Sequence, residues 1–185
     1  AYNALDNLQN TCNTPLIETP LIIGTSMGNV LKKDMLNKTK QDPLLDNLVK
    51  KYKLSKNSFC ITTACSASLG AISIGTSLIK EGIHDSVLIG GVDCINPITF
   101  SGFNSLRSLD PETSRPFDQN RKGIVIGEGA GFLLLESEKH QKKTKNKIYA
   151  EVCGIGFYQD THSKTSPNPN GKAIEQCMKN ALNNA

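Results

Sequence analysis

Short apolar runs alternate with helical patterns through the first half of the chain. The runs at 21–24, 58–62 and 87–91 have the length of buried strands. Between them, residues 43–53 show an apolar helical face, and residues 66–80 carry small and apolar residues around most of the helix circumference, which predicts a buried helix. Strands that recur with crossover-sized helical spacers are typical of parallel pairing. We therefore predict an α/β fold with a partly parallel sheet.

The second half of the chain returns to this pattern after a long polar stretch. Residues 95–121 are rich in turn formers, and we expect an ordered functional loop there. Residues 124–136 and 148–152 then predict strands, with a Lys-rich helix between them. The last residues, from 172 onward, show the pattern of an amphipathic helix.

Glycines at 127, 129 and 131 alternate within an apolar run. A phosphate-binding turn would need its glycines between a strand and a helix, whereas these lie inside or before a strand. We therefore favour close packing between backbones as their role. In the preceding loop, we expect Arg115 to pair with Asp118 or with backbone carbonyls.

Composition places the chain among ordinary globular proteins, since its 185 residues are 38% hydrophobic and 21% charged. Its 21 Lys and Arg against 17 Asp and Glu give a net charge of +4, which is too mild to predict a nucleic-acid partner. We interpret the dense lysines of 139–147 as a solvated helix end. No apolar stretch approaches the roughly 20 residues that span a bilayer, and no signal-peptide pattern opens the chain, so we expect a cytoplasmic protein without a membrane partner. The absence of an initiator Met and the helical pattern at the end predict a fragment of a longer protein.

The six cysteines form no CxxC pair, so we predict neither a metal site nor a disulfide framework. Cys65 lies in TTACSAS, at the junction of a predicted strand and a predicted helix. A thiol at a helix N-terminus faces unpaired backbone N–H groups, which favours the thiolate and strengthens the nucleophile. Small neighbours leave room for an acyl group beside the sulfur. A cysteine in an apolar setting is nevertheless most often an inert small hydrophobe, so local features leave both interpretations open.

Three further motifs accompany TTACSAS: GTSMG at 24–28, GGVDCINPITFSGFNSL at 90–106 and SRPFDQNRKGIVIGEGAGFLLLE at 114–136. In this order they resemble the N-terminal half of the β-ketoacyl-acyl carrier protein synthases, the elongating condensing enzymes. The resemblance implies a layered α-β-α, thiolase-like fold that is incomplete in this chain. Details of the motifs look most similar to the aryl-polyene-type subgroup.

The resemblance also implies a decarboxylative Claisen condensation in fatty acid or polyketide biosynthesis. Cys65 would carry the acyl chain as a thioester, and malonyl-acyl carrier protein would lose carbon dioxide and attack it, without a cofactor. In the family, two histidines from downstream motifs support decarboxylation, and His84, His140 and His162 match neither motif. We therefore expect the 185-residue chain by itself to be inactive in condensation.

Other family roles are implied at single positions. Met27 matches a residue that sets the depth of the acyl pocket, although a plain core Met is an equal alternative. Arg107 matches an arginine that touches the acidic helix of the acyl carrier protein. A mobile gating loop is implied at Asp160, Ser163, Thr165 and Ser166. Because Ser163 stands where the family often has His, gating by that side chain is open.

The resemblance divides the chain into residues 1–150, most of an N-terminal ketosynthase half, and residues 151–185, the beginning of a C-terminal half. It implies an acyl carrier protein and acyl and malonyl thioesters as partners and substrates, and a homodimer or a heterodimer as the assembly. The alternatives are a non-catalytic chain-length subunit and an inactive truncated ketosynthase. The chain-length class commonly replaces the nucleophile with Gln, so the cysteine at position 65 favours the enzyme.

Overall fold

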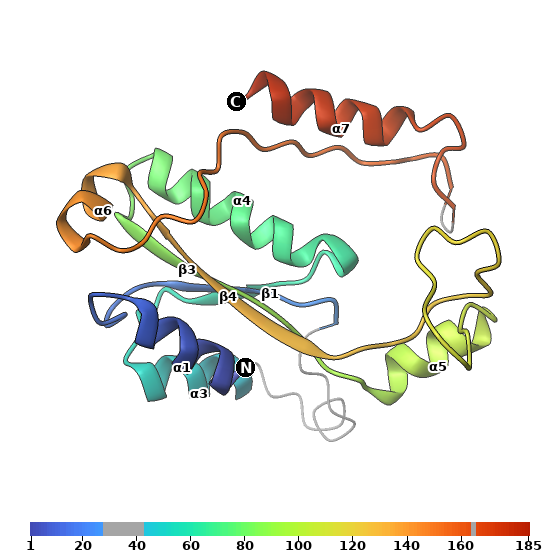
Figure 1. Ribbon diagram of the computed structural model, residues 1–185, viewed down its shortest axis with the longest axis horizontal. Helices are drawn as coiled ribbons and strands as arrows, with labels where there is room; N and C mark the ends of the chain where they lie inside the picture. Colours follow the sequence, from blue (N-terminus) through green and yellow to red (C-terminus); the bar gives the residue numbers. More distant parts are fainter. Residues whose placement is uncertain (28–42, 164–165) are drawn as a thin grey trace. The chain divides into compact units, whose positions relative to one another are not determined.

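A computed structural model describes residues 1–27, 43–163 and 166–185 (Figure 1). The chain forms two compact units, Ala1–Asn146 and Lys147–Ala185. Each unit is described by itself below.

The first unit is built on a four-stranded sheet of order β2-β1-β3-β4. Strand β1 (Leu21–Gly24) pairs in parallel with β2 (Phe59–Ile61) and with β3 (Ser86–Asp93), whereas β4 (Gly129–Glu136) runs antiparallel to β3. These four strands confirm the predicted α/β class with a partly parallel sheet.

Helices cover both faces of this sheet, in the α-β-α order that was predicted (Figure 1). Helices α1 (Tyr2–Thr11) and α3 (Pro43–Tyr52) pack on one face, around a core that includes Leu21 and Ile23 of β1. Helix α4 (Ala67–Lys80) packs on the other face, against Ile22. The alternation along β1 explains why a continuous apolar run was needed, since both faces of the strand are buried.

Helix α4 is buried on one face only, so the prediction of an all-round buried helix is wrong for the structure as described. Ala67, Ala71 and Gly75 face the sheet and are buried, whereas Leu69 is 69% exposed. The small residues on the buried face let the helix axis approach the strands closely. The larger apolar residues Ile72, Ile74, Leu78 and Ile79 are partly buried and pack against the core on this face of the sheet.

The long segment between β3 and β4 contains a helix that the sequence reading missed, α5 (Pro97–Ser105). Its N-cap is Asn96, whose side chain accepts a hydrogen bond from the Thr99 N–H at 2.9 Å, and Pro97 occupies the first helical position. Asn followed by Pro is a recognised helix start, and it turns part of the expected loop at 95–121 into a helix.

Two predicted strands are shorter or absent. The strand predicted at 124–136 begins only at Gly129, because Ile124 instead forms an isolated bridge with Leu109. Residues 148–152 are all described and form no strand ladder, since the described residues of the second unit, 147–163 and 166–185, supply no strand to pair with them. The predicted Lys-rich helix is confirmed as α6 (Glu138–Thr144).

Two contacts also differ from expectation. A Cβ atom added to Gly127, Gly129 or Gly131 would meet no atom within 4 Å, so close backbone packing is not their role in this unit. Arg115 lies 3.5 Å from a carboxylate oxygen of Asp110 rather than pairing with Asp118. The Asp110 side chain is buried and accepts backbone N–H groups of its own turn, which places it beside the guanidinium.

The second unit consists of an extended segment and the predicted amphipathic helix, now α7 (Lys172–Asn183). A Cβ on Gly154 or Gly156 would lie 2.1 or 2.0 Å from helix carbonyl oxygens, so α7 rests directly on this glycine backbone. Side-chain amides of Asn180 and Asn184 donate to carbonyls of the extended segment, which fixes its register along the helix.

Candidate functional site

The carboxyl ends of the three parallel strands meet at one edge of the sheet. Gly24 pairs with Ile61 on one side and with Gly91 on the other, so the residues that follow each strand emerge together. Ligands of α/β proteins usually bind outside this edge. The segments found there are Thr25–Met27, the turn that holds Cys65, and the start of the chain between β3 and β4.

Cys65 occupies the centre of a short 3-10 turn, Ala64–Ser66, between β2 and α4. Its side chain is exposed. The turn is closed by Ser66, whose N–H and hydroxyl both donate to the Thr63 carbonyl, at 3.2 and 2.8 Å. Ala64 has a φ of +50°, a left-handed conformation that costs an alanine roughly 1–2 kcal/mol. This strained turn presents the thiol to solvent at the first turn of a packed helix.

Close contact between backbones holds this turn in place. A Cβ on Gly24 would lie 2.4 Å from the carbonyl carbon of Ala67, so only glycine allows β1 to approach the start of α4. Thr25 continues the contact by donating its N–H to the Ile61 carbonyl at 3.1 Å. The thiol at position 65 is therefore fixed by the sheet and not by a flexible loop.

The same edge holds a carboxylate that the sequence analysis did not single out. Asp93, the last residue of β3, accepts three hydrogen bonds on one oxygen, Oδ1. The donors are the Thr25 hydroxyl at 3.0 Å, and the N–H and hydroxyl of Ser26 at 2.9 and 2.8 Å. An acidic residue directly after the apolar run at 87–92 was the available sequence signal.

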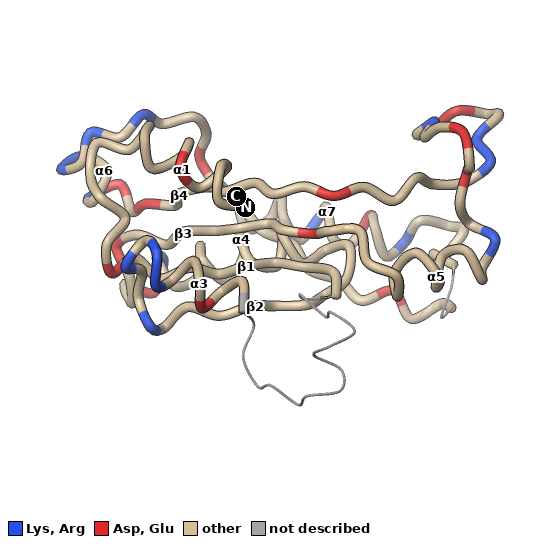
Figure 2. The backbone as a smooth tube through the Cα atoms, turned by 90° about the horizontal axis from the view of Figure 1, so that it is seen from below, with Lys and Arg blue, Asp and Glu red and all other residues tan. Residues whose placement is uncertain are grey.

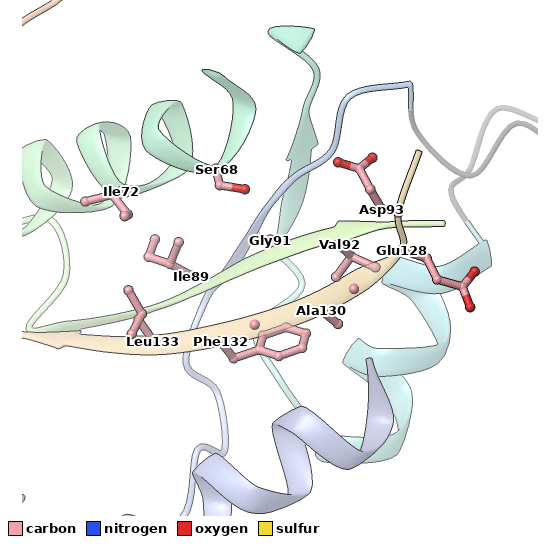
Figure 3. A pocket seen from close by; sticks show the side chains of 13 residues that line it. Ser68, Ile72, Ile89, Gly91, Val92, Asp93, Glu128, Ala130, Phe132 and Leu133 are labelled. Carbon is pink, nitrogen blue, oxygen red and sulfur yellow. The ribbon is translucent and has the colours of Figure 1, made fainter. Parts of the chain in front are cut away.

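Met27 follows this cluster directly and is 41% exposed. An open, mainly apolar hollow lies nearby on the sheet, between α4 and the last strands (Figure 3). Its walls include Ser68 and Ile72 of α4, and Phe132 and Leu133 of β4. Met27 does not line this hollow, and its place in an acyl pocket stays a prediction.

Arg107 ends helix α5 in a left-handed conformation, with a φ of +53°. Its N–H donates to the Asn104 carbonyl, and the next N–H, of Ser108, donates to the Phe103 carbonyl. These two bonds define a Schellman motif, in which glycine normally occupies the position of Arg107. An exposed arginine here costs backbone strain, which favours a role for its side chain.

In the second unit, Asp160 joins two parts of the predicted gating loop. Its carboxylate accepts the N–H of Asn168 at 2.8 Å and the N–H of His162 at 2.9 Å. These hydrogen bonds, the one from Asn168 foremost, hold the pKa of the Asp160 carboxyl below its ordinary value. Ser163 and Ser166 are exposed, and Thr165 lies outside the described residues.

His84, His140 and Cys12 lie away from this edge of the sheet. His84 precedes β3 and His140 follows β4, so both lie at the opposite edge of the sheet from Cys65. Burial raises the pKa of the Cys12 thiol, and the nearby Glu136 carboxylate adds to this effect. Among residues 1–27, 43–163 and 166–185, no cluster of His, Cys, Asp and Glu has the arrangement of a metal site.

Comparison with known proteins gives this geometry a context. A family model described as the N-terminal domain of β-ketoacyl synthase matches residues 47–141. A putative mitochondrial 3-oxoacyl-[acyl-carrier-protein] synthase of Schizosaccharomyces pombe is 36% identical, over 91% of this chain and 46% of its own length. The chloroplastic 3-oxoacyl-[acyl-carrier-protein] synthase II of Arabidopsis thaliana is 42% identical, over 69% of this chain and 25% of its own. The chain thus spans less than half the length of these relatives.

Solved structures show the same fold. A chain from the complex of a ketosynthase with its chain length factor, from Xenorhabdus doucetiae, matches all of this chain and 48% of its own, with 26% identity and a TM-score of 0.71. A β-ketoacyl synthase from Burkholderia phymatum covers 90% of this chain and 47% of its own, with a TM-score of 0.71; at 23% identity it supports the fold alone. The predicted thiolase-like class is confirmed for the part that this chain supplies.

Proposed function

Because this chain belongs to the β-ketoacyl synthase family, we propose that the protein carrying it is a β-ketoacyl-acyl carrier protein synthase whose acyl-bearing nucleophile is Cys65. One observation carries the proposal. The exposed thiol lies in a strained turn at the carboxyl edge of the parallel strands, at the first turn of a helix that packs tightly on the sheet.

The first step transfers an acyl group to the protein. The Cys65 thiolate attacks the thioester carbonyl carbon of an acyl donor, which is an acyl carrier protein or coenzyme A conjugate. A new C–S bond forms to Cys65, the donor C–S bond breaks, and the donor leaves as a thiol that takes up a proton. By resemblance to the family, the Cys65 N–H would be one donor to the developing oxyanion, and the second N–H would come from outside this chain.

The second step forms a carbon–carbon bond. Malonyl-acyl carrier protein loses carbon dioxide, and the electron pair of the broken bond remains on the α-carbon. This carbanion attacks the Cys65 thioester, the C–S bond to Cys65 breaks, and the sulfur regains a proton. The product is a β-ketoacyl thioester on the carrier, and the groups that assist decarboxylation come from outside this chain.

Partner and substrate contacts follow from the same proposal. Arg107 is exposed at a position that strains its backbone, which supports a contact with an acidic carrier protein. Met27 would close the acyl pocket, and Asp160, Ser163, Thr165 and Ser166 would form a gate. The structure with a chain length factor offers a precedent for pairing with a second ketosynthase-like chain, so a homodimer or heterodimer is proposed here.

Residues 1–150 are proposed as the N-terminal ketosynthase half and residues 151–185 as the start of the C-terminal half. The division of the chain into units that meet at Asn146 and Lys147 supports a boundary in this region. In the part of the chain that is described, no helix reaches the length and apolarity of a membrane span. We propose a cytoplasmic location. On the details of its motifs, we also propose that the protein belongs to the aryl-polyene-type subgroup.

The test is acylation of the thiol in the full-length protein. Incubation with an acyl-coenzyme A donor is expected to add the mass of one acyl group, and peptide mapping should place it on Cys65. Cys65→Ala should abolish the adduct. Cys94→Ala is the matched control, because Cys94 is also exposed and follows β3 at the same edge of the sheet.

An adduct that survives Cys65→Ala, or one that maps to Cys94, would contradict the assignment. Alkylation by iodoacetamide near neutral pH gives an independent measure. We expect Cys65 to react ahead of the partly buried Cys12, Cys60 and Cys177 and ahead of the exposed Cys94 and Cys153. Equal labelling of Cys94 or Cys60 would also count against Cys65.

A further inference from the structure

Asp93 concentrates its hydrogen bonds in an unusual way for an exposed carboxylate. Three donors from two consecutive residues, Thr25 and Ser26, converge on Oδ1 alone. All three are neutral groups, and none of the ion pairs found among the described residues involves Asp93. The side chain therefore acts as an acceptor that organises a turn, and not as one half of a salt bridge.

The position of this contact explains what it holds. The ladder between β1 and β3 ends at the pair Gly24 and Gly91, so the chain beyond Gly24 is no longer held to β3 by its backbone. Asp93 lies two residues beyond Gly91, and its side chain accepts hydrogen bonds from the Thr25–Ser26 turn. Figure 3 shows this side chain at the end of β3. On the other side, the Thr25 N–H bonds to β2 through the Ile61 carbonyl. The turn is thus held by hydrogen bonds to both neighbouring strands, β2 and β3.

Two segments depend on the hydrogen bonds between Asp93 and the Thr25–Ser26 turn. Met27, the predicted floor of the acyl pocket, follows Ser26 directly in the chain. Gly24, just before this turn, touches the backbone of Ala67, two residues after Cys65. A shift of the turn would therefore move Met27 relative to the nucleophile.

We propose that Asp93 is a positioning residue that fixes the Thr25–Ser26 turn and thereby sets how long an acyl chain Cys65 accepts. The inference rests on the proposed function, since it assigns a selectivity role within that site. The hydrogen bonds that Asp93 accepts come from Thr25 and Ser26. Asp93 acts through the turn that carries Met27.

The substitutions Asp93→Ala and Asp93→Asn separate the acceptor from the charge. Asparagine keeps an Oδ1 acceptor, so Asp93→Asn should retain the hydrogen bonds from Thr25 and Ser26. Asp93→Ala should lose them. In the full-length protein, the ratio of kcat/KM for a long and a short straight-chain acyl-coenzyme A donor is expected to change roughly tenfold in Asp93→Ala. In Asp93→Asn it should stay within about twofold of the unmodified protein.

A second readout needs no activity. The Ser26 N–H donates directly to Asp93, so the rate of its hydrogen exchange reports whether this hydrogen bond is formed. Exchange at Ser26 should be about tenfold faster in Asp93→Ala and nearly unchanged in Asp93→Asn. Should Asp93→Ala not fold, Ser26→Ala removes one donor from the other side of the contact and should shift the selectivity ratio in the same direction.

The outcomes separate this inference from the function on which it rests. If none of the donors acylates Cys65 in the unmodified protein, the proposed function is contradicted. Hydrogen exchange at Ser26 would still test the hydrogen bond to Asp93. Unchanged Ser26 exchange in Asp93→Ala would overturn the inference. So would an unchanged selectivity ratio in Asp93→Ala while Cys65 is still acylated.

Discussion

The turn around Cys65 and the loop closed by Asp160 are both exposed, but they are held in different ways. The Cys65 turn is fixed by backbone packed against backbone, where Gly24 meets the start of α4. The Asp160 loop is fixed by one carboxylate that accepts two backbone N–H groups. Packing of this kind has no titratable component, whereas a carboxylate clamp depends on its charge.

This difference suits the two roles proposed for them. A nucleophile gains from a fixed position, since small displacements of reacting atoms slow a reaction strongly. A gate must open, and a loop held by a few local hydrogen bonds opens at low cost. Figure 2 shows that acidic and basic residues lie on helices and loops and are sparse along the strands of the sheet. The turn at Arg107 shares a feature with each of these regions. Its backbone is held by local hydrogen bonds, and its charged side chain is exposed to solvent.

The largest expected effect comes from breaking the packed turn. Gly24→Ala places a Cβ about 2.4 Å from backbone atoms of Ala67 and Ser68, which cannot move aside as a flexible side chain does. We expect the free energy of unfolding to fall by about 3 kcal/mol or more, measured by urea denaturation of this chain.

Gly131→Ala is the matched control for that substitution, because Gly131 is also a strand glycine but has open space around it. Its free energy of unfolding should change by no more than about 0.5 kcal/mol. Comparable losses in both variants would mean that close approach at Gly24 is not what holds the Cys65 turn.

The four strands of the sheet, the helix α4 and the turn that holds Cys65 were predictable because each has a strong local signal. Continuous apolar runs mark strands that are buried on both faces, and the junction of 58–62 with 66–80 located the Cys65 turn. The left-handed conformation of Ala64 was not predictable, since nothing in an alanine indicates it. It arises from the tertiary constraint between β2 and α4.

Other predictions were wrong because the features they concern depend on neighbours that are distant in sequence. Whether 148–152 forms a strand depends on a pairing partner, and whether Leu69 is buried depends on a covering element. The Asp93 contact joins residues 67 positions apart, so no local pattern indicates it. Helix α5 is the exception, because its Asn96–Pro97 start is a local signal for a helix.

The Arg107 turn offers the next largest effect, because it allows strain and charge to be separated. Arg107→Glu is expected to raise the KM for acyl carrier protein donors about tenfold and to leave short coenzyme A donors almost unchanged, since only the carrier presents an acidic surface. Equal losses with both donors would contradict a carrier contact.

Arg107→Gly sharpens this result. Glycine suits the left-handed position, so the free energy of unfolding should rise by about 0.5–1 kcal/mol. The KM for carrier donors should nevertheless increase, because the charge is gone. A variant that is both more stable and poorer with the carrier would show that the arginine is kept for its side chain; an unchanged KM would show the opposite.

The smallest expected effect is on the Asp160 loop, and it depends on pH. Because the folded pKa of Asp160 is lowered, its contribution to the loop is complete above the ordinary value of 3.8 and is lost as the pH falls through the lower, folded value. The amide proton shifts of His162 and Asn168, followed by NMR during acidification, should therefore change together with a midpoint below 3.8. Asp160→Asn keeps acceptor oxygen but removes the titration, so these shifts should become independent of pH in this range, while Gly24 and the Cys65 turn show no matching transition in either protein. A midpoint at or above 3.8 would mean that the hydrogen bonds to Asp160 do not stabilise its charged form, and that the loop is held by something other than this carboxylate.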